Sequence, residues 1–530
     1  MILTRLIAAV ARTPGAARRN GRVRELVHAA ASMRAAGNPE GAETALREAL
    51  EIDAAAPATH GELALLLTGQ ARLDAALPHF RAGHAAGGLS AEALGEFVRV
   101  LLARREDDEA ERVAEAAAAA HAASPRTWFA LGLSRLAAHR YTDALGCFER
   151  SLELAPPDAE RITYRAIALQ NLGRRAEAVV GYDAALTLAP GYALARFHKS
   201  LTLLAGGEYR TGWPEYEARL ASAELAARPP RYPRWDGVAD GRTVLVYGEQ
   251  GLGDEIMFAS CLPDLLRSGV RCAVECTPAL RSLFERAFPE AVVYAAAPDR
   301  AVPDHVRALG IAAEAPIGSL PLYYRPVEDA FPGHEGYLRA DPERVERWRG
   351  RARGLGPGLA VGISWRGGTH ASRAPLRSLT LTELLPVLRT PGVRFLSLQY
   401  GPEAASELKA FEASSGIRIE HWPEAIDDYD ETAALVSALD LTLSVCTSVV
   451  HLAGALGRPV WVLAPSNAEW RYGVTGEAMR WYPSARILRQ ARTGESIRVS
   501  GYAERWDGVI EEARLRLVAR AADAGFIKDK

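Results

Sequence analysis

The chain has 530 residues, of which 48% are hydrophobic and 24% charged, and its formal net charge is −2 at pH 7. This near-neutral balance provides no basic field for nucleic acid or for an acidic membrane surface, so neither is expected as a partner. The five cysteines form no CxxC pair, which gives no sign of a disulfide framework or a zinc site and favours a reducing compartment. The apolar patch at the start is short for a signal peptide, and no later stretch reaches about 18 uncharged apolar residues. We therefore expect a cytoplasmic protein without a transmembrane segment.

Small residues recur every 34 residues from residue 23 to about residue 220. The recurring small positions are Ala42, Ala76, Ala110, Ala144, Ala178 and Gly212. Four residues after each of them stand Leu46, Phe80, Ala114, Phe148, Tyr182 and Tyr216. Twelve residues before each of them stand Ala30, Ala64, Val98, Gly132, Ala166 and Ser200. Small side chains at these positions let two antiparallel helices approach closely, and the larger residue fills the space between neighbouring pairs.

This period and residue pattern resemble the tetratricopeptide repeat, and LGLSRLAAHRYTDALGCFERSLELAPPD is the clearest copy. The resemblance implies a solenoid of six helix pairs over residues 23–222, after an N-terminal extension at 1–22. Such solenoids commonly hold a peptide or protein segment on their concave surface, so a protein partner is expected there. A spacer or a dimerisation module is the alternative, and a homo-oligomer stays open.

Two units with alternating strand and helix patterns follow a proline-rich linker at 223–242. The first unit, 243–345, has predicted strands at 243–247, 272–275 and 291–294 and predicted helices at 255–267 and 282–288. A charged helix is expected within 339–358. The second unit, 357–490, has predicted strands at 359–364, 393–399, 417–420, 441–445 and 460–463, and predicted helices at 382–388, 402–414, 431–439 and 449–456. The remainder, 491–530, contains a predicted amphipathic helix at 506–521. This order predicts an α-solenoid followed by two doubly wound α/β units that face each other across a cleft.

The loop GEQGLGDE follows the first strand of the first unit and opens a helix. Its glycines, which include Gly251 and Gly253, fit neither the dinucleotide pattern nor the P-loop. We expect them to allow positive φ and a close approach of the backbone to a ligand. Asp254 either caps the helix, which is the commoner fate of such a residue, or removes a proton from an acceptor hydroxyl. Glu249 and Gln250 are the candidate acceptor contacts of this loop.

The second unit has polar residues at the ends of two predicted strands. Ser364 and Arg366 lie in GISWRGGT, and Arg373 and Arg377 follow within one loop. Guanidinium groups bind phosphate oxygens in a forked geometry, so this loop suits a diphosphate; surface arginines on a flexible loop are an equal alternative. The residues that end the next strand, where a base or ribose could stack or form hydrogen bonds, are Gln399 and Tyr400.

The stretch LTLSVCTSVVHLAGALGRPVWVLAP has the pattern strand, tight turn, helix, strand. Thr447, Ser448 and His451 stand at the expected helix N-terminus, where free N–H groups and the helix dipole favour a phosphate. An equally weighted alternative is that Thr447 and Ser448 cap the helix and that His451 packs beneath it.

Together these motifs resemble the glycosyltransferase family that includes the bacterial heptosyltransferases, on the two-domain GT-B fold, over residues 243 to about 490. The resemblance implies that Asp254 is the catalytic base and that Thr447, His451 and the ALGRP turn hold the donor diphosphate. Cys446 stands where that family has Asp, and Ser448 stands where glycine is often found. GEQGLGDEIMF and APSNAEWRYG look closer to the branch that carries tetratricopeptide repeats, which is often assigned to protein or flagellar glycosylation.

The resemblance implies an inverting glycosyltransferase that needs neither a metal nor a cofactor. It would move a sugar from a nucleotide-sugar donor to a hydroxyl of a protein acceptor held by the repeats, such as flagellin or another surface protein. One alternative is transfer to a surface or lipid-linked saccharide. Another is a non-catalytic adaptor, which is an alternative because Cys446 replaces the Asp of that family. The hypothesis expects the turn at 446–451 to be open to a donor and to face Asp254.

Overall fold

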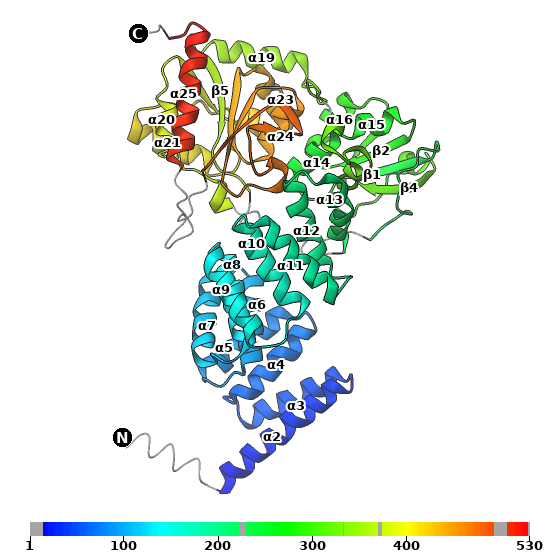
Figure 1. Ribbon diagram of the computed structural model, residues 1–530, viewed down its shortest axis with the longest axis vertical. Coiled ribbons are helices and arrows are strands. Elements are labelled where there is room, and N and C mark those ends of the chain that lie inside the picture. Colours follow the sequence, from blue (N-terminus) through cyan, green and yellow to red (C-terminus); the bar gives the residue numbers. More distant parts are fainter. Residues whose placement is uncertain (1–13, 222–228, 332, 369–373, 492–505, 528–530) are drawn as a thin grey trace. The chain divides into compact units, whose positions relative to one another are not determined.

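The computed structural model describes residues 14–221, 229–331, 333–368, 374–491 and 506–527 (Figure 1). The chain divides into two compact units, Met1–Tyr192 and Ala193–Lys530. The first unit is helical, and the second combines one further helix pair with two mainly parallel sheets. The predicted class, a helical solenoid followed by an α/β part, is therefore confirmed.

Helices of the first unit pair in the order of the chain. The pairs in its described part are α2 (Pro14–Ala35) with α3 (Pro39–Ile52), α4 (Pro57–Gly69) with α5 (Leu73–Ala85), α6 (Ala91–Ala103) with α7 (Asp107–Ala120), α8 (Pro125–Ala137) with α9 (Tyr141–Glu153), and α10 (Ala159–Asn171) with α11 (Arg175–Leu188). Asn38, Ser90 and Asp158 cap α3, α6 and α10, because their side chains accept hydrogen bonds from free N–H groups of the first turn. The predicted repeat is confirmed.

The repeat positions that carry small residues in the sequence are buried between the helices. Ala76, Ala110, Ala144 and Ala178 have 0% exposure. At Gly132 of α8, a Cβ atom would lie 2.4 Å from Cε1 of Phe148 in α9. The Phe148 ring is itself fully buried, so the absence of a side chain at 132 lets the two helices pack.

The sixth repeat belongs to the second unit. Its helices are α12 (Ala193–Ala205) and α13 (Tyr209–Tyr216), followed by the short helix η1 (Glu217–Leu220). The sequence groups this repeat with the solenoid up to residue 222, but Trp213 and Tyr216 of α13 are buried in the core of the second unit. The indole N–H of Trp213 donates to the carbonyl oxygen of Arg325 at 2.7 Å.

The first sheet of the second unit is parallel and has the strand order β3-β2-β1-β4. Its strands are β1 (Thr243–Tyr247), β2 (Arg271–Cys276), β3 (Val292–Ala295) and β4 (Ile311–Pro316). One face packs against α14 (Leu252–Ala259) and α15 (Leu262–Arg267), and the other packs against α17 (Asp304–Arg307). The sheet, these helices and residues 229–242 form the first α/β region, which also contains α16 (Arg281–Ala287) and α18 (Leu320–Tyr324).

Part of the predicted linker is built into this region. Arg234 forms a parallel bridge with Glu314 of β4, and the N–H of Trp235 donates to the carbonyl oxygen of Glu314 at 2.8 Å. The Trp235 side chain is buried and packs on Tyr323 with ring centroids 4.9 Å apart. Residues 229–242 are therefore not a free linker; residues 222–228 lie outside the described residues.

The second sheet has the strand order β6-β5-β7-β8-β10-β9 and is parallel except for the β10–β9 pair. Its strands are β5 (Leu359–Ser364), β6 (Val393–Ser397), β7 (Leu441–Val445), β8 (Val460–Ala464), β9 (Ala478–Met479) and β10 (Tyr482–Arg489). The helices on one face are α19 (Pro342–Arg353), α22 (Pro423–Ile426), α23 (Tyr429–Ala438) and α24 (Ser448–Ala455), and those on the other are α20 (Leu385–Leu388), α21 (Ala404–Ser415) and α25 (Asp507–Asp523) (Figure 1). These elements form the second α/β region.

Some predicted elements of this region need correction. The strand expected at 417–420 is reduced to a single bridge between Glu420 and Leu396. The strands β9 and β10 were missed, because β10 begins with Tyr-Pro-Ser and carries arginines, which hide its apolar positions. The final helix is confirmed as α25, and it packs on the second sheet.

Within the described ranges, none of the helices combines the length and the apolar character that crossing a bilayer requires.

The Gly132 contact predicts a difference in stability between two glycine substitutions. Gly132→Ala and Gly146→Ala both gain helix propensity, but Gly146 has open space at its Cβ position. We expect Gly132→Ala to be less stable than Gly146→Ala by about 1–3 kcal/mol, the cost of overpacking a filled core. Urea unfolding followed by circular dichroism measures the difference. Equal stability would show that the Phe148 ring moves aside freely.

Candidate functional site

The candidate site lies where the helices after β1 and β7 meet. A Cβ atom on Gly253 in α14 would lie 2.9 Å from Cδ2 of His451 and 3.4 Å from Cα of Ser448, both in α24. Any side chain at 253 would push these helices apart. The two motifs that the sequence singled out, GEQGLGDE and the turn at 446–451, therefore lie side by side. Each follows the carboxyl end of a parallel strand, where α/β sheets place their ligands.

Asp254 lies in the first turn of α14 with two partners. Its Oδ2 accepts from the N–H of Gly251 at 3.3 Å, which caps the helix. Its Oδ1 lies 2.6 Å from Nη2 of Arg471, and both side chains are about six-sevenths buried, with exposed fractions of 14% and 15%. Burial raises the pKa of Asp254 although Arg471 and the Gly251 N–H oppose that change. The carboxylate thus caps α14, pairs with Arg471 and has a raised pKa.

The glycines of this loop serve close packing. The positive φ expected at the glycines occurs instead at Gln250, with φ of 64°, whereas Gly251 has φ of −111°. A Cβ on Gly248 would lie 2.5 Å from the carboxyl carbon of Glu255. A left-handed backbone at a non-glycine residue costs about 1–3 kcal/mol, so the surroundings must hold Gln250 in place.

Residues of the sixth repeat provide that support. The side-chain amide of Gln250 donates to the hydroxyl of Tyr216 at 2.9 Å. Glu249 accepts from Arg219 at 2.6 Å and from the N–H of Gly318 at 3.0 Å. Arg219 is fully buried, and it also pairs with Glu217 at 2.7 Å. Glu249 and Gln250, the predicted acceptor contacts, are therefore occupied in fixing the loop before Asp254.

The turn at 446–451 has the geometry of a helix cap over a packed histidine. The Thr447 hydroxyl accepts from the N–H of Val449 at 3.3 Å and lies 3.0 Å from the Ser444 hydroxyl. His451 Nδ1 lies 3.1 Å from the hydroxyl of Tyr482, and its Nε2 lies 3.5 Å from that of Tyr472. Burial lowers the pKa of His451 well below its ordinary value, and nearby arginines add to this effect.

The expectation that this turn is open to a donor needs correction. Thr447 is 6% exposed and His451 is 2% exposed, because α14 lies against α24 and the two tyrosines enclose the histidine. The other half of the expectation agrees with the structure, since the turn faces the loop that carries Asp254. Ser448 is half-buried, and Cys446 is fully buried at the end of β7.

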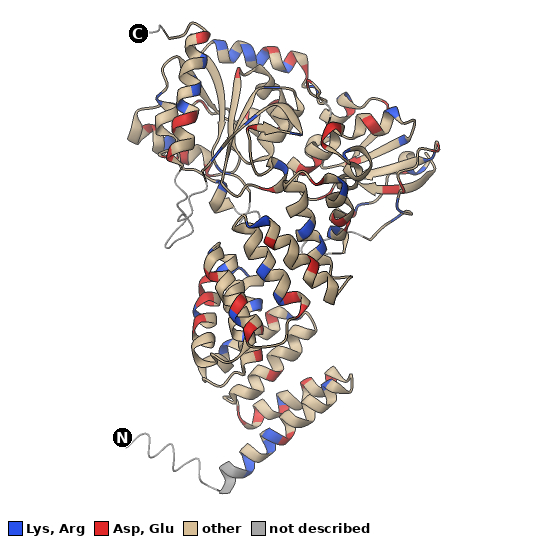
Figure 2. Ribbon diagram, viewed as in Figure 1, with Lys and Arg blue, Asp and Glu red and all other residues tan. Residues whose placement is uncertain are grey.

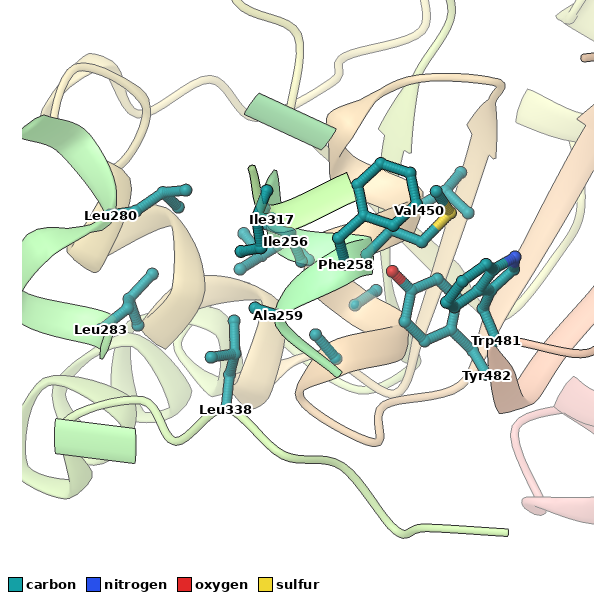
Figure 3. Packing of buried hydrophobic residues seen from close by; sticks show 14 of the residues in the cluster. Ile256, Phe258, Ala259, Leu280, Leu283, Ile317, Leu338, Val450, Trp481 and Tyr482 are labelled. Carbon is teal, nitrogen blue, oxygen red and sulfur yellow. The ribbon is translucent and has the colours of Figure 1, made fainter. Parts of the chain in front are cut away.

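Apolar side chains form the base on which these groups rest. Figure 3 shows Ile256 and Phe258 of α14 in one cluster with Val450 of α24 and with Trp481 and Tyr482. This cluster joins the first α/β region to the second, so the approach of the two helices is held by buried apolar area as well as by ion pairs.

The loop after β5 lies against the same turn. A Cβ on Gly367 would lie 2.2 Å from Cγ2 of Thr447. Gln399 shapes this loop, because its side-chain oxygen accepts from the N–H groups of Trp365 at 3.0 Å and Arg366 at 2.9 Å. Ser364 also lies 3.3 Å from that oxygen.

Three further residues were predicted to bind the sugar donor, and they differ in whether their side chains are free to do so. The Arg366 guanidinium is paired with Glu407 of α21 at 2.8 Å. Tyr400 is 45% exposed, and its hydroxyl accepts from the N–H of Gly368 at 3.4 Å, which suits a stacking role. Arg373 lies outside the described residues.

The main charged partners come from a segment for which the sequence predicted no role in the site. Arg471 pairs with Asp254, and Glu469 lies 2.9 Å from Arg377. Both residues stand in APSNAEWRYG, directly after β8. Charged residues after a buried parallel strand were the available signal, because such strands end at the ligand-binding edge of their sheet.

The acidic residues before α23 have structural partners. Asp428 caps α23, and Asp430 forms a two-point ion pair with Arg286 of α16, with distances of 2.8 and 2.9 Å. Figure 2 shows the basic residues along α19, and of these Arg347 pairs with Glu431 at 2.7 Å. In the part of the chain that the structure describes, no group of three or more His, Cys, Asp or Glu side chains is arranged to hold a metal ion.

Arg219 provides a stability prediction. Arg219→Met leaves the buried Glu249 without its guanidinium, so we expect a loss of about 3–5 kcal/mol. Of the ten tryptophans, Trp128 alone precedes Ala193, so unfolding followed by tryptophan fluorescence reports mainly on the second unit. The double variant Arg219→Met with Glu249→Gln should cost less than the sum of the single changes. Arg281→Met, which breaks the exposed Arg281–Glu285 pair in the second unit, should change stability by less than about 1 kcal/mol. If the losses of the two single variants simply add in the double variant, the Arg219–Glu249 ion pair does not couple the two residues.

His451 provides a prediction on pH. Because burial lowers its pKa in the folded protein, the unfolded chain binds more protons once the pH falls below the ordinary value. Stability should therefore fall with acidification, by up to about 1.4 kcal/mol per pH unit for one proton. His451→Gln, which cannot titrate, should show a shallower loss between pH 7 and pH 5 in urea unfolding. Parallel profiles for the two proteins would contradict this reading of His451.

Comparison with known proteins identifies the repeats and one relative. Residues 125–158 match the family described as tetratricopeptide repeat. Several solved structures resemble the repeats. YrrB, described as a TPR protein with an unusual peptide-binding site, is 19% identical, with a TM-score of 0.29 over 33% of this chain and 91% of that one. PilF of Pseudomonas aeruginosa is 20% identical, with a TM-score of 0.32 over 38% of this chain and 91% of that one.

A curated relative extends over most of the chain. Protein FlbA of Caulobacter vibrioides is 35% identical over 407 residues, which cover 72% of this chain and 67% of FlbA. The described helices, the repeat match and this relative together make the chain a tetratricopeptide-repeat protein with an α/β part. At this identity and coverage, the chain belongs to the FlbA family.

Proposed function

We propose that this protein is an inverting glycosyltransferase that moves a sugar from a nucleotide-sugar donor to a hydroxyl of a protein acceptor. The observation that carries the proposal is the contact of Gly253 with Ser448 and His451, which brings a buried carboxylate next to a helix N-terminus. The two α/β regions, each with helices on both faces of a mainly parallel sheet, suit the GT-B arrangement that the sequence motifs resemble.

In this mechanism Asp254 accepts the proton of the acceptor hydroxyl. The acceptor oxygen bonds to the anomeric carbon of the sugar as the bond from that carbon to the diphosphate oxygen breaks, and the leaving diphosphate keeps the bonding electrons. Burial raises the pKa of Asp254, which makes its carboxylate a stronger base. The first turn of α24, with the Thr447 and Ser448 hydroxyls, stabilises the charge that develops on the leaving group.

In this proposal the contact between α14 and α24 is the donor-free stage, because the space at Gly253 is already filled by His451 and Ser448. Thr447 and His451 are buried in this stage, so neither water nor a donor reaches the turn. A donor enters only when the first and second α/β regions separate at this contact. Opening and closing of this kind is a common step in transferases with two facing parts.

The repeats provide the surface for the acceptor. A stacked series of helix pairs forms an extended surface that suits a protein segment. We assign acceptor binding to the first unit, because the sixth repeat is occupied in supporting the Asp254 loop.

A second candidate function is that of a non-catalytic adaptor. Cys446 is fully buried in the place where the related transferases have Asp, and Thr447 caps its own helix. A site that retains only structural roles would still present the repeats to a partner. As an adaptor, the protein would bind a partner protein without catalysing a reaction.

A donor assay distinguishes the two candidates. The full chain is incubated with UDP-, GDP-, dTDP- and ADP-sugars and a lysate fraction that binds the repeats, and both nucleoside diphosphate release and mass increments on bound proteins are measured. We expect one donor to be consumed, and Asp254→Asn to lower turnover by about 10²–10⁴-fold, the usual loss for a general base. Asp264→Asn, which breaks the Arg325 ion pair on the neighbouring helix, should retain turnover. No donor consumption across the panel would favour the adaptor, and full turnover in Asp254→Asn would exclude Asp254 as the base.

A further inference from the structure

Four charged side chains of the described residues form a cluster of two ion pairs at the candidate site. Asp254 is paired with Arg471 at 2.6 Å, and Glu469 is paired with Arg377 at 2.9 Å. All four are largely buried, with exposed side-chain fractions between 11% and 18%. Two guanidinium groups and two carboxylates therefore balance each other in a region from which most water is excluded.

This cluster adjoins the turn at 446–451. Arg471 and Arg377 are both close enough to His451 to disfavour its protonated form. The partner of Arg471, Asp254, follows Gly253, which is in contact with His451 and Ser448. Arg471, through Asp254 and Gly253, thus lies beside the first turn of α24, where a phosphate is favoured.

Arg471 is held in place from a second side. Its guanidinium carbon lies 5.7 Å from the centroid of the Trp470 ring, and Trp470 is itself part of the aromatic core of the second unit. This contact holds the guanidinium group against the ring, while its N–H groups can exchange one anionic partner for another. A guanidinium pairs with a carboxylate and with a phosphate in the same forked geometry.

A bound diphosphate would disturb the balance of this cluster. It adds negative charge next to Arg471 and Arg377, whose own charges are already neutralised by Asp254 and Glu469. In a buried site an uncompensated charge is costly, so the diphosphate and a carboxylate compete for the same guanidinium.

We propose that the donor diphosphate displaces Asp254 from Arg471, so that donor binding and release of the base are a single exchange of ion-pair partners. This inference rests on the proposed transferase function and assigns to Arg471 the role of a diphosphate-binding residue. Before the donor binds, Arg471 neutralises Asp254, and neither an acceptor hydroxyl nor a water molecule is activated. After the exchange, Asp254 lacks its counterion and accepts a proton more readily. The order of binding follows: the donor first, the acceptor second.

The exchange makes an unusual prediction for affinity, because the proposed base competes with the ligand. Asp254→Asn removes the competitor, so this variant should bind a nucleoside diphosphate more tightly than the unmodified protein does. An increase of roughly 5- to 150-fold corresponds to the usual range of coupling between two ligands. Arg471→Met should weaken binding by a comparable factor, and the double variant should bind no more tightly than Arg471→Met.

Isothermal titration calorimetry of the full chain with UDP, GDP, ADP and inorganic pyrophosphate tests this. Asp264→Asn is the matched control, since Asp264 is similarly buried, lies on the neighbouring helix α15 and is paired with Arg325 at 2.8 Å; its dissociation constant should equal that of the unmodified protein. Asp254→Ser carries the same expectation as Asp254→Asn, and circular dichroism establishes which of the two variants is folded before titration.

The outcomes separate this inference from the proposed function. Tighter binding by the folded Asp254 variant together with weaker binding by Arg471→Met supports the exchange. If the unmodified protein binds a diphosphate and the Asp254 variant binds it equally or more weakly, the exchange is wrong while the transferase proposal stands. If the unmodified protein binds none of the four probes, both proposals fail.

Discussion

The contact between α14 and α24 is the constraint on which the rest of the second unit depends. It exists because residue 253 is glycine, so the backbone of one helix reaches Ser448 and His451 of the other. Apolar residues from both helices enter one continuous core beneath this contact. The helix α14 follows β1 of the first sheet, and α24 follows β7 of the second. Their contact therefore sets the position of the carboxyl edge of one sheet relative to that of the other. The contact places Asp254 next to the turn at 446–451.

The sixth repeat adds a second constraint on the same loop. Tyr216 and Arg219 bind Gln250 and Glu249, the two residues that precede the first turn of α14. Gln250 keeps a left-handed backbone only because its side chain is held from outside the loop. A residue that stands among the repeats in the sequence is thus part of the support for a carboxylate in the α/β part. Within the second unit, side-chain contacts through this loop therefore link the sixth repeat to the site.

Much of the fold could be predicted from the sequence because its signals are local. The strands β1, β5 and β7 are continuous apolar runs between turn residues, and their predicted bounds agree with the structure. The repeat positions follow from a fixed period of small residues. The site was predicted less well. The sequence located Asp254 and the turn at 446–451, but not Arg471, because an ion pair between residues so far apart leaves no local pattern. The burial of His451 also depends on Tyr472 and Tyr482, which belong to elements that the sequence did not reveal.

The membership of α12 and α13 in the second unit has a practical consequence for work with fragments. A piece of the chain that stops at Leu220 would keep Trp213 and Tyr216 but lose Phe258, Trp470 and Trp481, the aromatic residues that cover them. Such an uncovered aromatic surface favours self-association. A piece that stops at Tyr192 contains the helix pairs of the first unit and leaves those aromatic residues with the rest of the chain. The shorter fragment is therefore the sound starting point for isolating what the repeats hold.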